Sequence, residues 1–154
     1  MGRVYKEGCE VISLRDAREK VINILGSEEV PAQTTLRTWA NQGVISGVIE
    51  GSTQKAKYSD IVVSEILAAI EAKKEYKLSE IAEVRSNIDF TRKDYYIKRL
   101  SNYIDKLTKE QEKLFDFVRS DRKDLVIKKL ENKLSELKEI EKKIKLVKVY
   151  SKYI

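Results

Sequence analysis

The chain has 154 residues, of which 36% are charged and 42% hydrophobic, and its formal net charge is +6. This length fits one domain with an appendage or two small domains, and so polar a mixture is typical of long exposed helices. All six glycines and the single proline lie at or before Gly51. An all-β fold is therefore excluded for the rest of the chain, because hairpins need turn residues.

The positive charge is concentrated in the C-terminal part of the chain. Residues 88–154 carry 19 basic against 12 acidic side chains, whereas residues 1–87 carry 12 against 13. A pI near 9.2 is typical of nucleic-acid binding, but a lysine-rich tail can equally serve only to solvate an exposed helix. Any DNA contact by the first 87 residues must therefore come from a local patch.

No segment of the sequence predicts membrane insertion or catalysis. No apolar run approaches the roughly 20 residues that span a bilayer, and the N-terminus has no signal-peptide core, so we expect a cytoplasmic protein. One cysteine and no histidine exclude an internal disulfide framework and argue against a His/Cys metal site. With no P-loop, no GxSxG motif and carboxylates spaced as helix-surface charges, we expect no enzyme, no metal and no cofactor.

Two short helices joined by a turn are predicted in the first third of the chain. Residues 13–25 place apolar side chains on one helical face, with Ser13 as N-cap and Gly26 as the stop. A second helix follows at about residues 33–42, and Gly43 ends it. This pair is typical of a helix-turn-helix. The inward-facing residues of the second helix are Leu36, Trp39 and Ala40.

A hairpin and two further helices complete the N-terminal region. Apolar β-formers flank two glycines in residues 44–58, which predicts a short β-hairpin or wing. Ser59 or Asp60 then caps a helix over residues 61–74. Leu78 opens another short helix that can fold back on it.

Beyond Asn87 the sequence predicts long helices with heptad seams. One seam runs over residues 97–118 and a second over residues 127–137, with a break near residues 119–124. The first helix, about 40 Å long at 1.5 Å per residue, needs a partner from the second segment, from a second subunit, or both. A homodimer is the economical answer. The seam residues assigned to dimerisation are Ile97, Leu100, Ile104, Leu107, Leu114, Val118, Ile127, Leu130, Leu134 and Leu137.

The outer face of the helix at residues 33–42 carries hydroxyl, guanidinium and amide groups, which suit phosphate oxygens and base edges. Arg37 can pair with guanine or grip a phosphate, and Asn41 can read adenine. An ordinary solvent-exposed helix face would account for each of these polar residues individually. It accounts less well for the whole pattern, in which the helix is followed by a wing that carries lysines. The predicted DNA-binding residues are Thr34, Thr35, Arg37, Thr38, Asn41, Lys55, Lys57 and Tyr58.

The stretch TLRTWANQGVI, a wing ending in KYS, and the run DIVVSEILAAIEAKKEYKLSEIAEV together resemble the winged helix-turn-helix domain of MerR-type regulators. The resemblance covers about residues 13–87, and the tail matches only in being coiled coil. It implies that Arg37 and Tyr58 contact DNA phosphates, with the wing lysines assisting, and that two subunits bind a pseudo-palindromic site. The matching positions are Leu36-Arg37, Gly43, Tyr58-Ser59 and Lys77-Leu78-Ser79-Glu80-Ile81.

The sequence departs from that family at three points. The first helix and turn are several residues longer, and Trp39 stands where the family often has tyrosine, so a contact made by a tyrosine hydroxyl does not carry over. The tail has neither a cysteine cluster nor a second ligand-binding domain, so we expect no small-molecule effector.

The last segment, residues 138–154, carries six lysines against two glutamates, interleaved with apolar residues. Such a basic amphipathic end can continue a helical bundle, sit on DNA, or bind an anionic membrane surface or a further protein. Bundle packing is favoured, because the same apolar spacing begins upstream.

The sequence therefore predicts a mainly α protein. A winged helix-turn-helix head with a small β-wing occupies residues 1–87, and a coiled-coil dimerisation tail occupies residues 88–154. The function predicted is that of a dimeric, sequence-specific, double-stranded DNA-binding transcriptional regulator associated with the nucleoid. The alternative is a DNA segregation or anchoring factor that tethers a plasmid or chromosome through its tail. A third candidate is an excisionase-type architectural factor.

Overall fold

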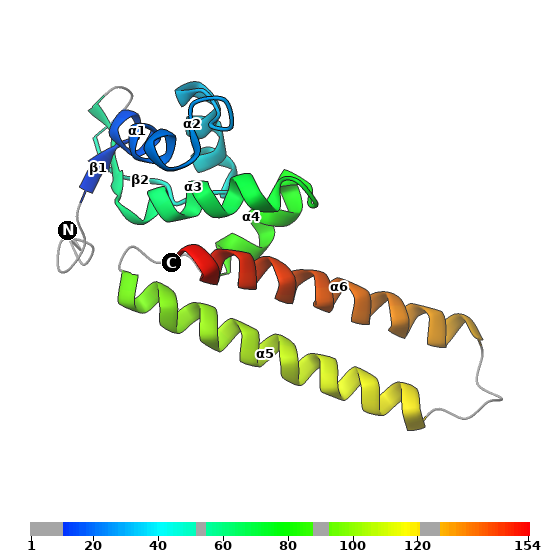
Figure 1. Ribbon diagram of the computed structural model, residues 1–154. Helices are drawn as coiled ribbons and strands as arrows, with labels where there is room; N and C mark the ends of the chain where they lie inside the picture. The colour runs from blue at the N-terminus through cyan, green and yellow to red at the C-terminus, as the bar shows by residue number, and fades with distance from the viewer. Residues whose placement is uncertain (1–10, 52–54, 88–92, 121–126) are drawn as a thin grey trace.

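The computed structural model describes residues 11–51, 55–87, 93–120 and 127–154, with side chains in the last two segments described only over 98–116 and 131–154. These residues form six helices and a small three-stranded antiparallel sheet, so the mainly helical prediction is confirmed (Figure 1). In chain order the elements are β1 (Val11–Ser13), α1 (Leu14–Leu25), α2 (Gln33–Gln42), β2 (Val48–Glu50), β3 (Lys57–Ser59), α3 (Ile61–Ala72), α4 (Leu78–Ser86), α5 (Lys93–Ser120) and α6 (Ile127–Tyr153).

Local signals fix the ends of the first two helices. The Ser13 side chain caps α1 by accepting a hydrogen bond from the Asp16 amide at 3.1 Å. The chain leaves α2 through Gly43, whose φ of 88° lies in the left-handed region that favours glycine. The predicted bounds of both helices are therefore confirmed.

The sheet has the strand order β1-β3-β2, with both pairs antiparallel. The β2–β3 pair is the hairpin that the sequence predicts over residues 44–58. Strand β1, which places Ile12 opposite Tyr58, is not predicted from the sequence. Three residues are too few to show an alternating pattern, and β3 lies far along the chain.

Helix α3 packs against α1, and α4 follows it in the chain. Asp60 is the N-cap of α3 but makes no side-chain capping bond, and the Ser59 hydroxyl just before it accepts a hydrogen bond from the Ile61 amide at 3.3 Å. At the start of α4, the Glu80 carboxylate accepts a hydrogen bond from the Lys77 amide at 3.0 Å. We call the unit formed by the sheet and α1–α4 the head. Its most deeply buried large side chains include Leu36, Trp39, Ile45, Tyr58, Ile66 and Ile81.

Helices α5 and α6 lie side by side and run in opposite directions, forming what we call the tail hairpin (Figure 1). Of the predicted break near residues 119–124, the first two residues belong to the end of α5, and residues 121–124 lie outside the described residues. Helix α6 lies between α5 and the head and packs against α3 and α4. Leu146, Val147 and Tyr150 of α6 join the core of the head and are at most 1% exposed. None of the described helices is long and apolar enough to cross a membrane.

Candidate nucleic-acid interface

The outer face of α2 presents the polar side chains that the sequence singles out. Thr34, Thr35, Thr38 and Asn41 are exposed, and Arg37 is half-buried. The Thr38 hydroxyl donates to the Thr34 carbonyl at 3.2 Å, so its proton is already used within the helix. The predicted inward face is confirmed, since Leu36, Trp39 and Ala40 are buried.

A pocket of about 530 Å³ opens beside α2 where three elements meet. Arg37 comes from α2, Arg15 from the first turn of α1, and Tyr58 from β3. The amides at the start of α1 and the two guanidinium groups favour an anion, although Asp16 also lines the pocket. The lining residues are Ser13, Leu14, Arg15, Asp16, Gln33, Arg37, Ala56 and Tyr58.

Two residues of this pocket differ from the sequence-based prediction of the DNA-binding site: Tyr58, which is buried, and Arg15, which is not among the predicted residues. Tyr58 is only 2% exposed, so it packs into the head and can meet a ligand only through the pocket. Arg15 is absent from the predicted site, because it belongs to the preceding helix, α1, and the sequence does not show that this residue lies beside α2. Its place in the first turn, where a helix attracts anions, is the signal that points to it.

The lysines of the β2–β3 hairpin flank this surface. Lys55 is exposed and Lys57 is half-buried. Glu50 lies opposite Lys57 in the strand ladder, so part of the positive charge of the hairpin is offset locally. Lys55 is therefore the more available cation of the two.

A buried ion pair supports the segment between α2 and β2. Glu65 of α3 and Arg85 of α4 are 0% and 2% exposed, and their charged atoms are 2.9 Å apart. The second Glu65 oxygen accepts from the Ser46 amide at 2.8 Å, and Arg85 donates to the Ser46 hydroxyl at 2.9 Å. This network is not predicted from the sequence, because an acidic residue inside a helix is usually a surface charge.

No family model, curated protein or solved structure matches this chain.

The lysine-rich end of the chain is largely engaged with the head. Three of its lysines pair with glutamates of α3 and α4: Lys142 with Glu80 at 2.6 Å, Lys143 with Glu83 at 3.4 Å and Lys152 with Glu71 at 2.8 Å. Residues 138–154 thus pack as part of a helical assembly, and the lysines that stay exposed outside these pairs are Lys138, Lys145 and Lys148.

The ionisation of the head glutamates follows from these pairs. Hydrogen bonds from Lys152 and then Tyr153 lower the pKa of Glu71, and the Tyr153 hydroxyl is 2.6 Å from that carboxylate. The hydrogen bond from Lys142 lowers the pKa of Glu80. Both carboxylates therefore stay charged at neutral pH and hold α6 against the head.

The residues predicted for dimerisation divide into two groups. Leu100, Leu107 and Leu137 are buried, which leaves them little area to offer a second chain. By contrast, Leu134 is 48% exposed, and Ile104 and Leu114 are half-buried. The side chains of Ile97, Val118, Ile127 and Leu130 lie outside the described residues.

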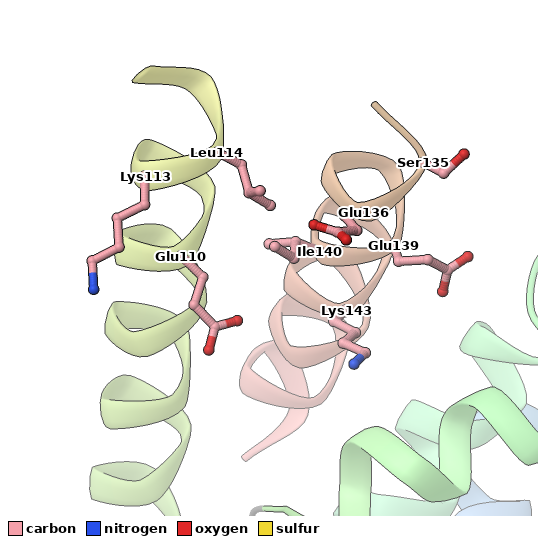
Figure 2. Close-up of a pocket in the computed structure, with 8 residues that line it drawn as sticks. All are labelled: Glu110, Lys113, Leu114, Ser135, Glu136, Glu139, Ile140 and Lys143. Atoms are coloured by element: carbon pink, nitrogen blue, oxygen red, sulfur yellow. The ribbon is translucent and has the colours of Figure 1, made fainter. Parts of the chain in front are cut away.

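An open groove of about 560 Å³ runs between the two tail helices. Figure 2 shows Leu114 of α5 and Ile140 of α6 extending toward each other across it. Charges of both signs surround this apolar floor: Lys113 and Lys143 together with Glu110, Glu136 and Glu139. Among the described residues, no group of histidine, cysteine and carboxylate side chains is arranged to hold a metal ion.

Proposed function

We propose that this protein binds double-stranded DNA in a sequence-specific manner through a winged helix-turn-helix head, acts as a homodimer and regulates transcription. One observation carries the proposal. The polar face of α2 is exposed immediately beside a pocket in which Arg37, Arg15 and the N-terminus of α1 converge. Binding of a specific duplex requires side chains that can hydrogen-bond to base edges and a nearby site that can bind a phosphate, and this surface offers both kinds of group.

In this proposal, α2 enters the major groove and the β2–β3 hairpin serves as the wing. Asn41 and the threonines of α2 face base edges, while Arg37 and Arg15 neutralise a phosphate at the pocket. Lys55 of the wing reaches the flanking backbone, and release of counterions supplies salt-dependent affinity.

The first prediction concerns Arg37. Arg37→Ala is expected to weaken binding to a duplex selected by the wild-type chain by about 1–3 kcal/mol at fixed salt, because a phosphate or guanine loses its guanidinium partner. Fluorescence anisotropy measures the affinity, and circular dichroism checks the fold. Lys148→Ala removes the same charge from an exposed site on α6 and should leave the affinity nearly unchanged. Equal affinities of the two variants would contradict the proposed site.

Two features of the tail hairpin support the homodimer. Phe115 and Leu134, on α5 and α6 far from the head, are 44% and 48% exposed. Burial of such exposed large apolar side chains against another surface is favourable, because it removes apolar area from water. The rim of the groove carries both lysines and glutamates, so a two-fold copy can place opposite charges together, whereas a partner of one sign would be repelled by part of the rim.

A second prediction tests this interface. Phe115→Ser combined with Leu134→Ser should raise the dimer dissociation constant on the order of 100-fold, because two buried side chains are lost from the interface. Sedimentation equilibrium measures it, and the head should melt as before. Ile24→Ser is the control, since Ile24 is 61% exposed on α1. If the double variant has the same dimer dissociation constant as the control, this end of the tail hairpin is not part of the dimer interface.

The alternative, a DNA segregation or anchoring factor, differs in what the tail binds. The packing of residues 138–154 on the head leaves Lys138, Lys145 and Lys148 as the exposed lysines outside the head contacts, a narrower surface for a membrane or further protein. A genome-wide footprint separates the two functions. Occupancy of one or a few promoters supports a regulator, and occupancy of a repeated array supports segregation.

A further inference from the structure

The segment that joins α2 to the β2–β3 hairpin is fixed by hydrogen bonds from several elements. Val44, Ile45 and Ser46 are at most 3% exposed. The Val44 amide donates to the Trp39 carbonyl of α2 at 2.9 Å, which ties the segment to the end of that helix. Ser46 is held by the Glu65–Arg85 pair from α3 and α4.

The remaining support comes from the far end of the tail. The Tyr150 hydroxyl donates to the Val44 carbonyl at 2.8 Å, across 106 positions of sequence. Tyr150 is 0% exposed, and this burial raises its pKa well above the ordinary value, so the hydroxyl keeps its proton. Val44 is therefore bound on one side by α2 and on the other by α6.

We infer that Tyr150 is a positioning residue for DNA reading, because its hydroxyl fixes the direction in which the chain leaves α2 and hence the angle between α2 and the β2–β3 hairpin. The inference rests on the proposed DNA-binding function. A duplex must meet both elements at once, and recognition tolerates misplacement of only about half an ångström and 10–20°. A buried contact at the hinge between them controls that geometry without touching DNA.

The chain itself supplies a matched control for this role. Tyr153, one turn further along α6, also donates its hydroxyl to the head, to the Glu71 carboxylate of α3 at 2.6 Å. That bond anchors α6 to α3 and involves none of the residues Val44–Ser46. A Tyr→Phe change at each position removes one hydroxyl and leaves each ring in place, so only the Tyr150 change should alter the hinge.

The experiment compares full-length Tyr150→Phe and Tyr153→Phe with the wild type. Hydrogen exchange should become on the order of tenfold faster at the Val44, Ile45 and Ser46 amides in Tyr150→Phe alone, because the Val44 carbonyl loses its buried partner. The same variant should bind the duplex selected by the wild type about tenfold more weakly. Its binding to a random duplex at low salt should change little, since phosphate attraction is less sensitive to the angle.

The outcomes separate the inference from the function on which it rests. Suppose that the wild type selects a duplex, and that both variants match it in their preference for that duplex over a random one and in hydrogen exchange at Val44–Ser46. This result would overturn the positioning role of Tyr150 and leave the proposed DNA binding intact. A wild-type chain that binds no duplex at low ionic strength overturns the proposed function and the DNA role of Tyr150 with it. Faster exchange at Val44–Ser46 together with lost discrimination, confined to Tyr150→Phe, supports both.

Discussion

Deleting residues 138–154 is expected to unfold the head rather than release it. Leu146, Val147 and Tyr150 lie in the core at 0–1% exposure. Burial of each such side chain contributes about 1.5–3 kcal/mol, so their joint loss approaches the 5–15 kcal/mol that keeps a typical domain folded. Thermal melting followed by circular dichroism should show a cooperative transition in the full chain and none in the truncated one.

A deletion at the other end of the tail hairpin is the control for this experiment. Replacing residues 117–133 by a short glycine-rich turn removes helix without touching α3, α4 or the last turns of α6. This variant should melt close to the wild type if the distal tip contributes only to dimerisation. A truncated chain that keeps the transition of the head would show that α6 is dispensable.

The same packing changes how any experiment on the tail must be designed. A cut after Asn87 or before residue 138 removes part of the core of the head along with the helix. Loss of DNA binding or recruitment in such a fragment would then reflect unfolding. Point changes at Phe115, Leu134, Lys145 or Lys148 test the exposed surfaces of the tail and leave the core complete.

Arg85→Ala is expected to destabilise the folded chain by about 3–5 kcal/mol, because it leaves the Glu65 carboxylate buried without its cation. Urea denaturation monitored by the fluorescence of Trp39 measures the change. Replacing the pair together, with Glu65→Leu and Arg85→Met, removes both charges and should recover much of the stability. Recovery relative to Arg85→Met alone, which keeps most of the side-chain volume, would identify the unpaired charge, rather than lost packing, as the cause.

The Lys142–Glu80 pair is the matched control for the buried one. Its charged atoms are 2.6 Å apart, but the Lys142 side chain is 36% exposed and water screens the attraction. Lys142→Ala should therefore shift the urea midpoint far less than Arg85→Ala. Similar shifts in the two variants would mean that burial does not set the strength of these pairs.

Local signals explain which parts of the fold are predictable. The capping Ser13, the left-handed Gly43 and the glycines around β2 act within a few residues, and the elements they predict are present. The strand β1 is missed because its partner β3 is more than forty positions away. Likewise, Glu65 reads as a surface charge until the fold brings Arg85 beside it.

The tail shows a different limit of sequence reasoning. A heptad seam identifies the helices, but the same spacing serves a partner in the same chain or in another. The structure pairs α5 with α6 and seats the end of α6 in the head, which periodicity alone does not specify. In the candidate site, the outward face of α2 follows from its inward residues, whereas the burial of Tyr58 and the approach of Arg15 depend on tertiary packing.

The contact between Tyr150 and Val44 has a consequence for synthesis of the chain. A ribosome delivers α2 and Val44 early, but Tyr150, whose hydroxyl binds the Val44 carbonyl, follows 106 positions later. Until then the nascent chain exposes the apolar surface of α3, and contacts this distant in sequence form slowly. The segment between α2 and the β2–β3 hairpin should therefore reach its final geometry only after Tyr150 has left the ribosome, so that, under the proposed function, shorter nascent chains would not bind DNA.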